Sequence, residues 1–264
     1  MNLAIFGLPG AGKGTLAALL RAQLGLLPIS TGDLLRAAGK EEGPMGDELR
    51  KLPVGSFAPD ELVLRVLMER ARRPDCANGM ILDGFPRTLA QARALLNSDV
   101  KPDAFVFLHE QESLVIERAL DRLWHPASGR VYNLKTKPPA TPGRDDETGE
   151  PLERRRDDQR EILERRCGDF REKTLPAALH CEEWAKQEGR LFLNAPAGAS
   201  LDAIVERLAQ AHAQSKAKKG AAGATGAGER LAQQRQGATG SHGEGASAQA
   251  SEEVLRRARR ALGR

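Results

Sequence analysis

The stretch Gly7-Leu8-Pro9-Gly10-Ala11-Gly12-Lys13-Gly14-Thr15 lies between a short apolar run and a helical pattern. We expect residues 2–6 to form a buried strand and residues 16–24 a helix. A strand, a glycine-rich turn and a helix in this order are the context of a phosphate-binding loop. Glycines allow backbone N–H groups to turn inward, where they and the helix N-terminus attract an anion. Lys13 would reach the terminal phosphates as a point charge.

One position departs from the general pattern, in which Ser or Thr follows the lysine directly. Here Gly14 follows Lys13, and the hydroxyl group comes one residue later, at Thr15. This Lys-Gly-Thr order is similar to the loop of nucleoside monophosphate kinases. On this stretch alone, a glycine-rich turn that binds nothing stays open as the alternative.

The net charge of +4 is unevenly distributed along the 264 residues. Ten Lys or Arg and four Asp or Glu follow His212, so this segment carries +6 and the preceding chain −2. The basic balance therefore says little about the ligand of the main domain. The three cysteines, Cys76, Cys167 and Cys181, have neither disulfide-framework nor metal spacing. No apolar run approaches the roughly 20 residues of a membrane span, so we expect a cytoplasmic protein with no membrane contact.

The next polar stretch, Ser30 to Arg36, follows an expected second strand at residues 26–30. Ser30 before a helical pattern is an N-cap signal, which places Arg36 about one turn into the helix. An arginine there can hold a phosphate through two hydrogen bonds, and an ordinary surface arginine is the alternative.

A third apolar run ends in Asp83, which predicts a carboxylate at the C-terminal edge of a strand. Open α/β sheets bind ligands at that edge, and beside a phosphate-binding loop such an aspartate holds the Mg²⁺ shell. A carboxylate that only caps the next helix is the alternative. Gly84 and Pro86 favour a turn that would point Arg87 back over the site, and Gln91 lies one helical turn further.

The later part of the chain predicts a helix from residue 59, strands at residues 103–108 and 190–194, and helices at residues 112–123 and 200–210. Two arginine pairs are expected on later helices. Arg118 and Arg122 would share one face of the helix at residues 112–123. Arg155 and Arg166 would lie about three turns apart on one face of a helix that begins near residue 154. A solvated helix face is the alternative for this second pair.

Residues 124–158 contain five prolines and three glycines and few large apolar side chains, which predicts an inserted lid. His125 and Ser128 are three residues apart, and so are Asp145 and Thr148. The spacing is that of a zinc ribbon, but Ser and Thr are poor zinc ligands. We therefore expect a hydrogen-bonded clasp; a bound metal, or a coincidence of spacing without contact, are the alternatives.

The C-terminal segment, residues 212–264, is rich in Ala, Gly, Gln and Ser and almost free of large apolar residues, which predicts disorder. Residues 251–262 have the pattern of a helix, but one too short to be stable alone. A solvated basic tail is the simplest interpretation. Binding of a nucleic acid or another partner is the alternative, and it would be salt-sensitive.

Over residues 1–211 the chain resembles adenylate kinase in its long-lid form. Five motifs carry the resemblance: Gly7–Thr15, Ser30–Arg36, Asp83–Arg87 with Gln91, Ser128–Tyr132 and Arg155–Gln159. The resemblance implies an α/β fold of the P-loop NTPase type, with a parallel five-stranded sheet flanked by helices. It also implies a core at residues 1–29, 59–120 and 159–211, an AMP-binding region at residues 30–58 and a lid at residues 121–158.

By the same resemblance the reaction is the reversible, Mg²⁺-dependent conversion of ATP and AMP into two ADP. The residues expected to bind ATP are Gly10, Ala11, Gly12, Lys13, Gly14, Thr15, Arg118, Arg122, Val131, Tyr132 and Ala197. Those expected to bind AMP are Thr31, Arg36, Ser56, Phe57, Ala58, Gly84, Phe85, Pro86, Arg87, Gln91, Arg155 and Arg166. The catalytic cations would be Lys13, Arg87, Arg122, Arg155 and Arg166, with Asp83 holding Mg²⁺ through water. Phosphoryl transfer depends mainly on positioning and charge stabilisation, which agrees with this inventory.

Two features depart from relatives. Metal-bearing lids have four ligands, mostly Cys, at the positions of His125, Ser128, Asp145 and Thr148, so this lid should be zinc-free. The loop after the fifth strand, usually Asp-Gly, reads Asn194-Ala195. A kinase for UMP or CMP is one alternative function, and a nucleotide-binding protein that works through its tail is another. We expect a monomer whose core does not bind nucleic acid.

Overall fold

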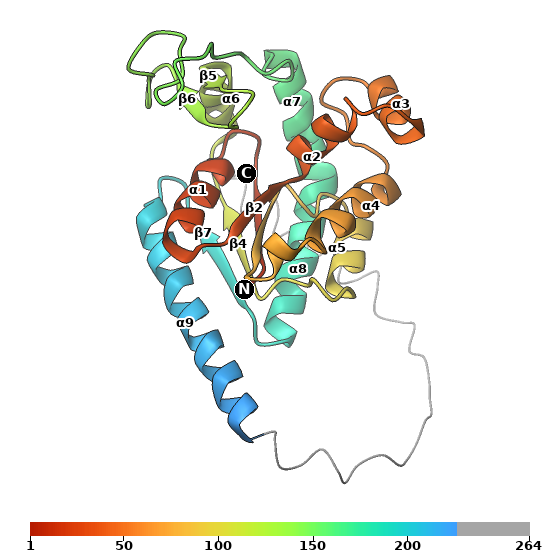
Figure 1. Ribbon diagram of the computed structural model, residues 1–264, viewed down its shortest axis with the longest axis vertical. Coiled ribbons are helices and arrows are strands. Elements are labelled where there is room, and N and C mark those ends of the chain that lie inside the picture. The colour runs from red at the N-terminus through yellow and green to blue at the C-terminus, as the bar shows by residue number, and fades with distance from the viewer. Residues whose placement is uncertain (226–264) are drawn as a thin grey trace.

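A parallel five-stranded sheet forms the centre of the molecule, with strand order β2-β3-β1-β4-β7 (Figure 1). The structure is a computed structural model that describes residues 1–225, and the side chains of residues 1–213. The strands are β1 (Leu3–Gly7), β2 (Leu27–Ser30), β3 (Met80–Asp83), β4 (Ala104–Leu108) and β7 (Leu191–Ala195). The predicted fold class is confirmed.

Helices cover both faces of this sheet, with α1 and α9 in contact on one face and α5 and α8 in contact on the other (Figure 1). The helices are α1 (Lys13–Leu24), α2 (Thr31–Ala38), α3 (Pro44–Lys51), α4 (Asp60–Ala71), α5 (Leu89–Leu96), α6 (Glu112–Leu120), α7 (Arg160–Asp169), α8 (Leu175–Gln187) and α9 (Leu201–Thr225). Two shorter turns are the 3₁₀ helix η1 (Pro74–Cys76) and the π-helical η2 (Phe170–Thr174). Because both faces are covered, β1 and β4 are continuous runs of buried residues.

Aromatic side chains fill the core between β1, β4, β7 and α8. The Phe105 ring has no exposed surface and stacks on Phe192, with ring centroids 5.7 Å apart. It also contacts Phe6 at 6.4 Å and the edge of Trp184 at 6.1 Å. Strands from distant parts of the chain are therefore joined through one ring.

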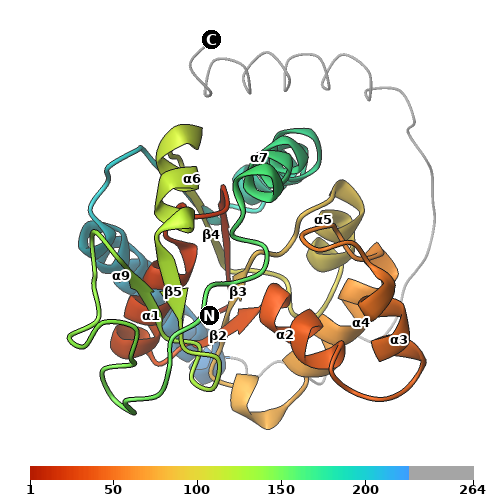
Figure 2. The ribbon, with the colours of Figure 1, turned by 90° about the horizontal axis from the view of Figure 1, so that it is seen from above.

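Two insertions rise from the end of the sheet where the strands terminate (Figures 1 and 2). One contains α2 and α3. The other contains a two-stranded antiparallel sheet, β5 (Arg122–Trp124) and β6 (Val131–Asn133). Seen from above, they lie on opposite sides of that end (Figure 2).

Two local predictions are wrong. Helix α6 ends at Leu120, so Arg122 lies on β5 and does not share a helix face with Arg118. Helix α7 begins at Arg160, so Arg155 lies in the preceding loop rather than on that helix with Arg166. In both cases a backbone turn interrupts a pattern that alone suits a helix.

Helix α9 continues to Thr225, well beyond the predicted end at residue 210. The expected helix at residues 251–262 lies outside the described residues. Within the described part of the chain, none of the helices combines the length and the apolar character needed to cross a membrane.

We predict that replacing Phe105 by Ala lowers the free energy of unfolding by about 3–5 kcal/mol, because it removes the shared ring and leaves a cavity. Urea unfolding followed by circular dichroism measures the change. Leu114→Ala on the exposed surface of α6 is the control, with an expected change within about 0.5 kcal/mol. Equal losses in the two variants would contradict this account of the core.

Candidate active site

The glycine-rich loop between β1 and α1 wraps around the ammonium group of Lys13. Lys13 Nζ donates hydrogen bonds to the carbonyl oxygens of Gly7 and Leu8, both at 2.9 Å. Gly10 has a φ of +87°, and a Cβ at this position would overlap the carbonyl group of Val115 on α6. The loop can pack this closely on α6 only because residue 10 is glycine.

The pKa of Lys13 is lowered to about 8, chiefly because burial disfavours its charged form. Asp83 acts in the opposite direction, while Arg87, Arg166 and Arg122 lower the pKa further. Lys13 therefore lies within a cluster of cations whose positive charge the neighbouring carboxylate of Asp83 neutralises only in part. An anion bound at the loop would favour the charged lysine.

Asp83 ends β3, as predicted, and its carboxylate faces the first turn of α1. A Cβ placed on Gly14 would lie 3.8 Å from Asp83 Oδ2, so the glycine leaves room between the carboxylate and the loop. Among the described residues, no group of three His, Cys, Asp or Glu side chains is arranged to hold a metal ion. A single carboxylate fits Mg²⁺, which takes one or two carboxylates together with waters and substrate phosphates.

A first cleft opens beside the loop. Its lining comprises Ile5, Phe6, Gly7, Pro9, Lys13, Phe57, Gly84, Pro86, Arg87, Arg166, Phe170 and Thr174. Phe170 and Thr174 belong to η2 and were not predicted as site residues, because no sequence motif marks them. The cleft thus joins the glycine-rich loop, the turn after β3 and the end of α7.

A second cleft adjoins the first and is lined by Thr31, Leu35, Ser56, Phe57, Ala58, Val63, Gly84, Arg87 and Gln91. All but Leu35 and Val63 were predicted to form one site, and the structure brings them together. Phe57, Gly84 and Arg87 line both clefts. Phe85, by contrast, points into the core and is fully buried.

Asp60, at the start of α4, holds Gln91 in place within the second cleft. Gln91 Nε2 donates to Asp60 Oδ1 at 2.7 Å, and Gln91 Oε1 accepts from the backbone N–H of Arg87 at 2.8 Å. Asp60 Oδ2 accepts from Thr88 Oγ1 at 2.8 Å. The orientation of the amide is therefore set by a residue that the sequence did not identify.

Apart from Arg87, the site arginines each have a carboxylate neighbour. Arg166 pairs with Asp157 at 2.6 Å, and Arg122 Nε donates to Asp158 Oδ2 at 2.8 Å. Arg36 pairs with Asp33, which also lies 4.0 Å from Arg155. Burial, and next the charge of Arg166, lower the pKa of Arg87 to about 10. Asp33, Asp157 and Asp158 were not predicted, since their roles depend on contacts made after folding.

Comparison with known protein families identifies the family to which this site belongs. A model of the adenylate kinase family matches residues 5–186. The chain belongs to the adenylate kinase family. It is therefore a nucleoside monophosphate kinase, a phosphotransferase. The matched region runs from β1 and the glycine-rich loop to α8. It therefore contains every cleft residue named above.

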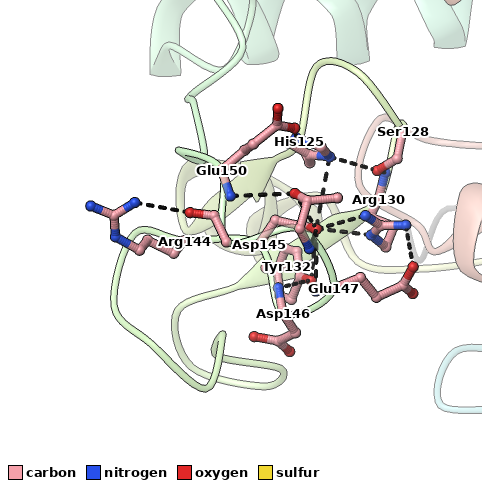
Figure 3. Close-up of polar contacts among 11 residues, drawn as sticks. His125, Ser128, Arg130, Tyr132, Arg144, Asp145, Asp146, Glu147 and Glu150 are labelled. Carbon is pink, nitrogen blue, oxygen red and sulfur yellow. Dashed lines mark hydrogen bonds and ion pairs between the residues drawn. The ribbon is translucent and has the colours of Figure 1, made fainter.

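In this adenylate kinase family member, Asp145 is the centre of the lid (Figure 3). Its carboxylate has no exposed surface and accepts from Arg130 Nε at 2.8 Å and Nη2 at 2.6 Å. The Tyr132 hydroxyl donates to Asp145 Oδ1 at 2.9 Å, and the Thr148 hydroxyl donates to Oδ2 at 3.0 Å. Arg130 holds the pKa of Asp145 well below its usual range.

His125 completes the contacts between the two predicted pairs. Its Nδ1 lies 2.8 Å from Ser128 Oγ and 3.8 Å from Asp145 Oδ1, while its Nε2 lies 2.7 Å from Glu150 Oε2 (Figure 3). The prediction of a hydrogen-bonded clasp is confirmed. Tyr132 is buried within this clasp.

Glu110 joins two of the residues expected at the ATP site. Its carboxylate pairs with Arg118 on α6, and Glu110 Oε1 accepts from the backbone N–H of Gly198 at 3.2 Å. Gly198 follows Ala197 in the loop after β7. The structure thus ties Arg118 to this loop through a largely buried glutamate that no motif identified.

We predict that ATP binding at pH 8 is accompanied by uptake of about half a proton, because Lys13 is then about half neutral and phosphates favour its charged form. Calorimetric titration in two buffers of different ionisation enthalpy measures the uptake. It should fall at pH 7, where Lys13 is already charged. Lys13→Arg, which stays charged at both pH values, is the control; equal uptake by that variant would contradict the assignment to Lys13.

We predict that Asp145→Asn speeds hydrogen exchange in residues 122–150 without changing exchange in the sheet, because it removes the charge that holds Arg130. The neighbouring Asp146→Asn is the control, since an amide oxygen can still accept from the backbone of Ala140 as Asp146 does. Exchange measured by mass spectrometry separates the two regions. Equal effects of the two substitutions would contradict the central role of Asp145.

Proposed function

We propose that this protein catalyses the reversible transfer ATP + AMP = 2 ADP with Mg²⁺, and so balances adenine nucleotides. The observation that carries the proposal is the pair of adjoining clefts that meet at Arg87. One contains the loop lysine, and the other contains the predicted AMP residues. Two phosphate chains entering from these clefts would meet between Lys13 and Arg87.

The donor phosphates would lie on the loop from Gly10 to Thr15, where backbone N–H groups and the positive end of α1 favour an anion. When bound, Mg²⁺ would neutralise phosphate charge, and Asp83 is the residue placed to hold its water shell. Arg118 and the backbone of Val131, Tyr132 and Ala197 would contact the rest of ATP.

The acceptor would occupy the second cleft, between Thr31, Gly84 to Arg87 and the segment from Ser56 to Ala58. Gln91 supports adenine as its base, because the amide retains one N–H and one lone pair beyond its bonds to Asp60 and Arg87. Adenine offers a ring nitrogen acceptor next to an amino donor. An acceptor with a pyrimidine base is the competing proposal.

The transferred phosphoryl group would be stabilised by Lys13 and by arginines from several elements: Arg36, Arg87, Arg122, Arg155 and Arg166. No strong general base is required, since the acceptor is already an anionic phosphate. Closure of residues 30–58 and of the lid, residues 121–158, would exclude water, which competes as acceptor.

We also propose that the protein acts as a cytoplasmic monomer. Its three cysteines are free and buried, which suits a reducing compartment. The proposed absence of zinc is supported by the lid, where Asp145 pairs with Arg130 and His125 contacts Ser128 and Glu150.

The first test is ADP formation from Mg-ATP with AMP, UMP, CMP or GMP offered separately. We expect strong preference for AMP. Preference for UMP, whose base has no amino donor, would retain the family but contradict the role of Gln91. Preference for CMP, whose base offers the same acceptor and amino donor as adenine, would contradict AMP as the acceptor, and transfer to none of them would refute the proposed activity. Lys13→Ala should lower kcat by at least about 10²–10³-fold with an unchanged fold by circular dichroism.

We predict that Arg87→Ala raises KM for AMP more than KM for ATP, because its guanidinium lines the acceptor cleft. Steady-state kinetics with each substrate varied in turn measures the two constants. Arg93→Ala, on the exposed side of the same helix region, is the matched control and should change neither. The reverse order of effects would mean that donor and acceptor clefts are exchanged.

A further inference from the structure

The loop of residues 54–57, between α3 and α4, lies against α7 and η2, which are more than a hundred residues away in the chain. Arg165 on α7 donates a hydrogen bond to the carbonyl oxygen of Val54. Gly55 packs so closely on α7 that a Cβ there would lie 2.6 Å from Ile162 Cγ2. The loop therefore sits on α7 through its backbone, while its last residue, Phe57, reaches the clefts.

The Phe57 ring is contacted by two cations. Arg87 Cζ lies 5.6 Å from the ring centroid, and Lys173 Nζ lies 5.0 Å from it. Aromatic rings attract cations at such distances through their negative faces. Phe57 is thus held between the acceptor cleft and a lysine that lines neither cleft.

Lys173 lies on η2 and pairs with the last residue of α7. Asp169 Oδ1 accepts from its ammonium at 2.6 Å, one turn back along the chain. The next residue, Thr174, donates to the backbone carbonyl of Arg87 at 3.0 Å. Adjacent residues of one π-helical turn therefore contact Phe57 and Arg87, and such turns frequently occur at functional sites.

We infer that Lys173 is a positioning residue of the acceptor site, holding Phe57 and with it residues 54–57 closed over the second cleft. It acts through the ring and does not touch the acceptor. The inference rests on the proposed function only in taking this cleft as the acceptor site. Removing the ammonium should open the loop, weaken acceptor binding and leave the donor site unchanged.

The contact is tested first without nucleotide, on the full chain, by hydrogen exchange of the backbone amide of Ser56, which donates to the carbonyl oxygen of Pro53 at 3.0 Å. Lys173→Met should exchange faster at this amide than the unsubstituted protein. Lys173→Arg, which keeps a cation, should restore slow exchange. Lys186→Met, an exposed lysine of α8, is the matched control and should have no effect. Equal exchange in Lys173→Met and the unsubstituted protein would overturn the inference.

The consequence for substrate is tested with the acceptor that the monophosphate panel selects. Lys173→Met should raise KM for that acceptor about two- to fivefold, with kcat and KM for ATP unchanged. In a Phe57→Leu background the same substitution should have no further effect. An equal rise in both backgrounds, a rise in KM for ATP, or an unchanged acceptor KM would each overturn the inference. Failure of the proposed function is seen separately, as the unsubstituted protein's inability to use AMP.

Discussion

Burial of like charges at the C-terminal edge of the sheet is the constraint on which the site depends. Burial lowers the pKa of Lys13 and that of Arg87, and the charges of neighbouring arginines lower both further. Asp83, Asp157 and Asp158 offset only part of this charge. A bound polyphosphate would supply the missing negative charge, so the free protein is already arranged to bind an anion.

Two carboxylates, the half-buried Asp60 and the buried Asp145, hold segments that lie beside these cations. Asp60 orients Gln91 and accepts a hydrogen bond from Thr88, after the turn that follows β3. Asp145 accepts hydrogen bonds from Arg130 and Tyr132 in the lid. Neither lies at the reacting centre. Each fixes the shape of a polar segment that lacks a hydrophobic core of its own, because a buried carboxylate is stable only when its oxygens are satisfied.

Sequence reasoning succeeded where a feature depends on neighbours in the chain and failed where it depends on a turn or a distant partner. Ser30 caps α2 by accepting from the backbone of Asp33, as its local pattern indicated. Arg122 was placed on a helix because its spacing from Arg118 suits one, but the chain turns at Asp121 into β5. Arg155 was misplaced in the same way. Glu110 and Lys173 escaped notice because their partners, Gly198 and Phe57, lie 88 and more than a hundred residues away.

The glycine-rich loop, the parallel α/β order, the lid and most residues of the two clefts were determined by the sequence itself, because glycine conformation, apolar runs and cap signals act over a few residues. The tertiary structure alone decided which carboxylate neutralises each arginine and which residue orients Gln91. It also decided which cations contact the Phe57 ring. These contacts join side chains that only the packing of separate segments brings within hydrogen-bond or ring-contact distance.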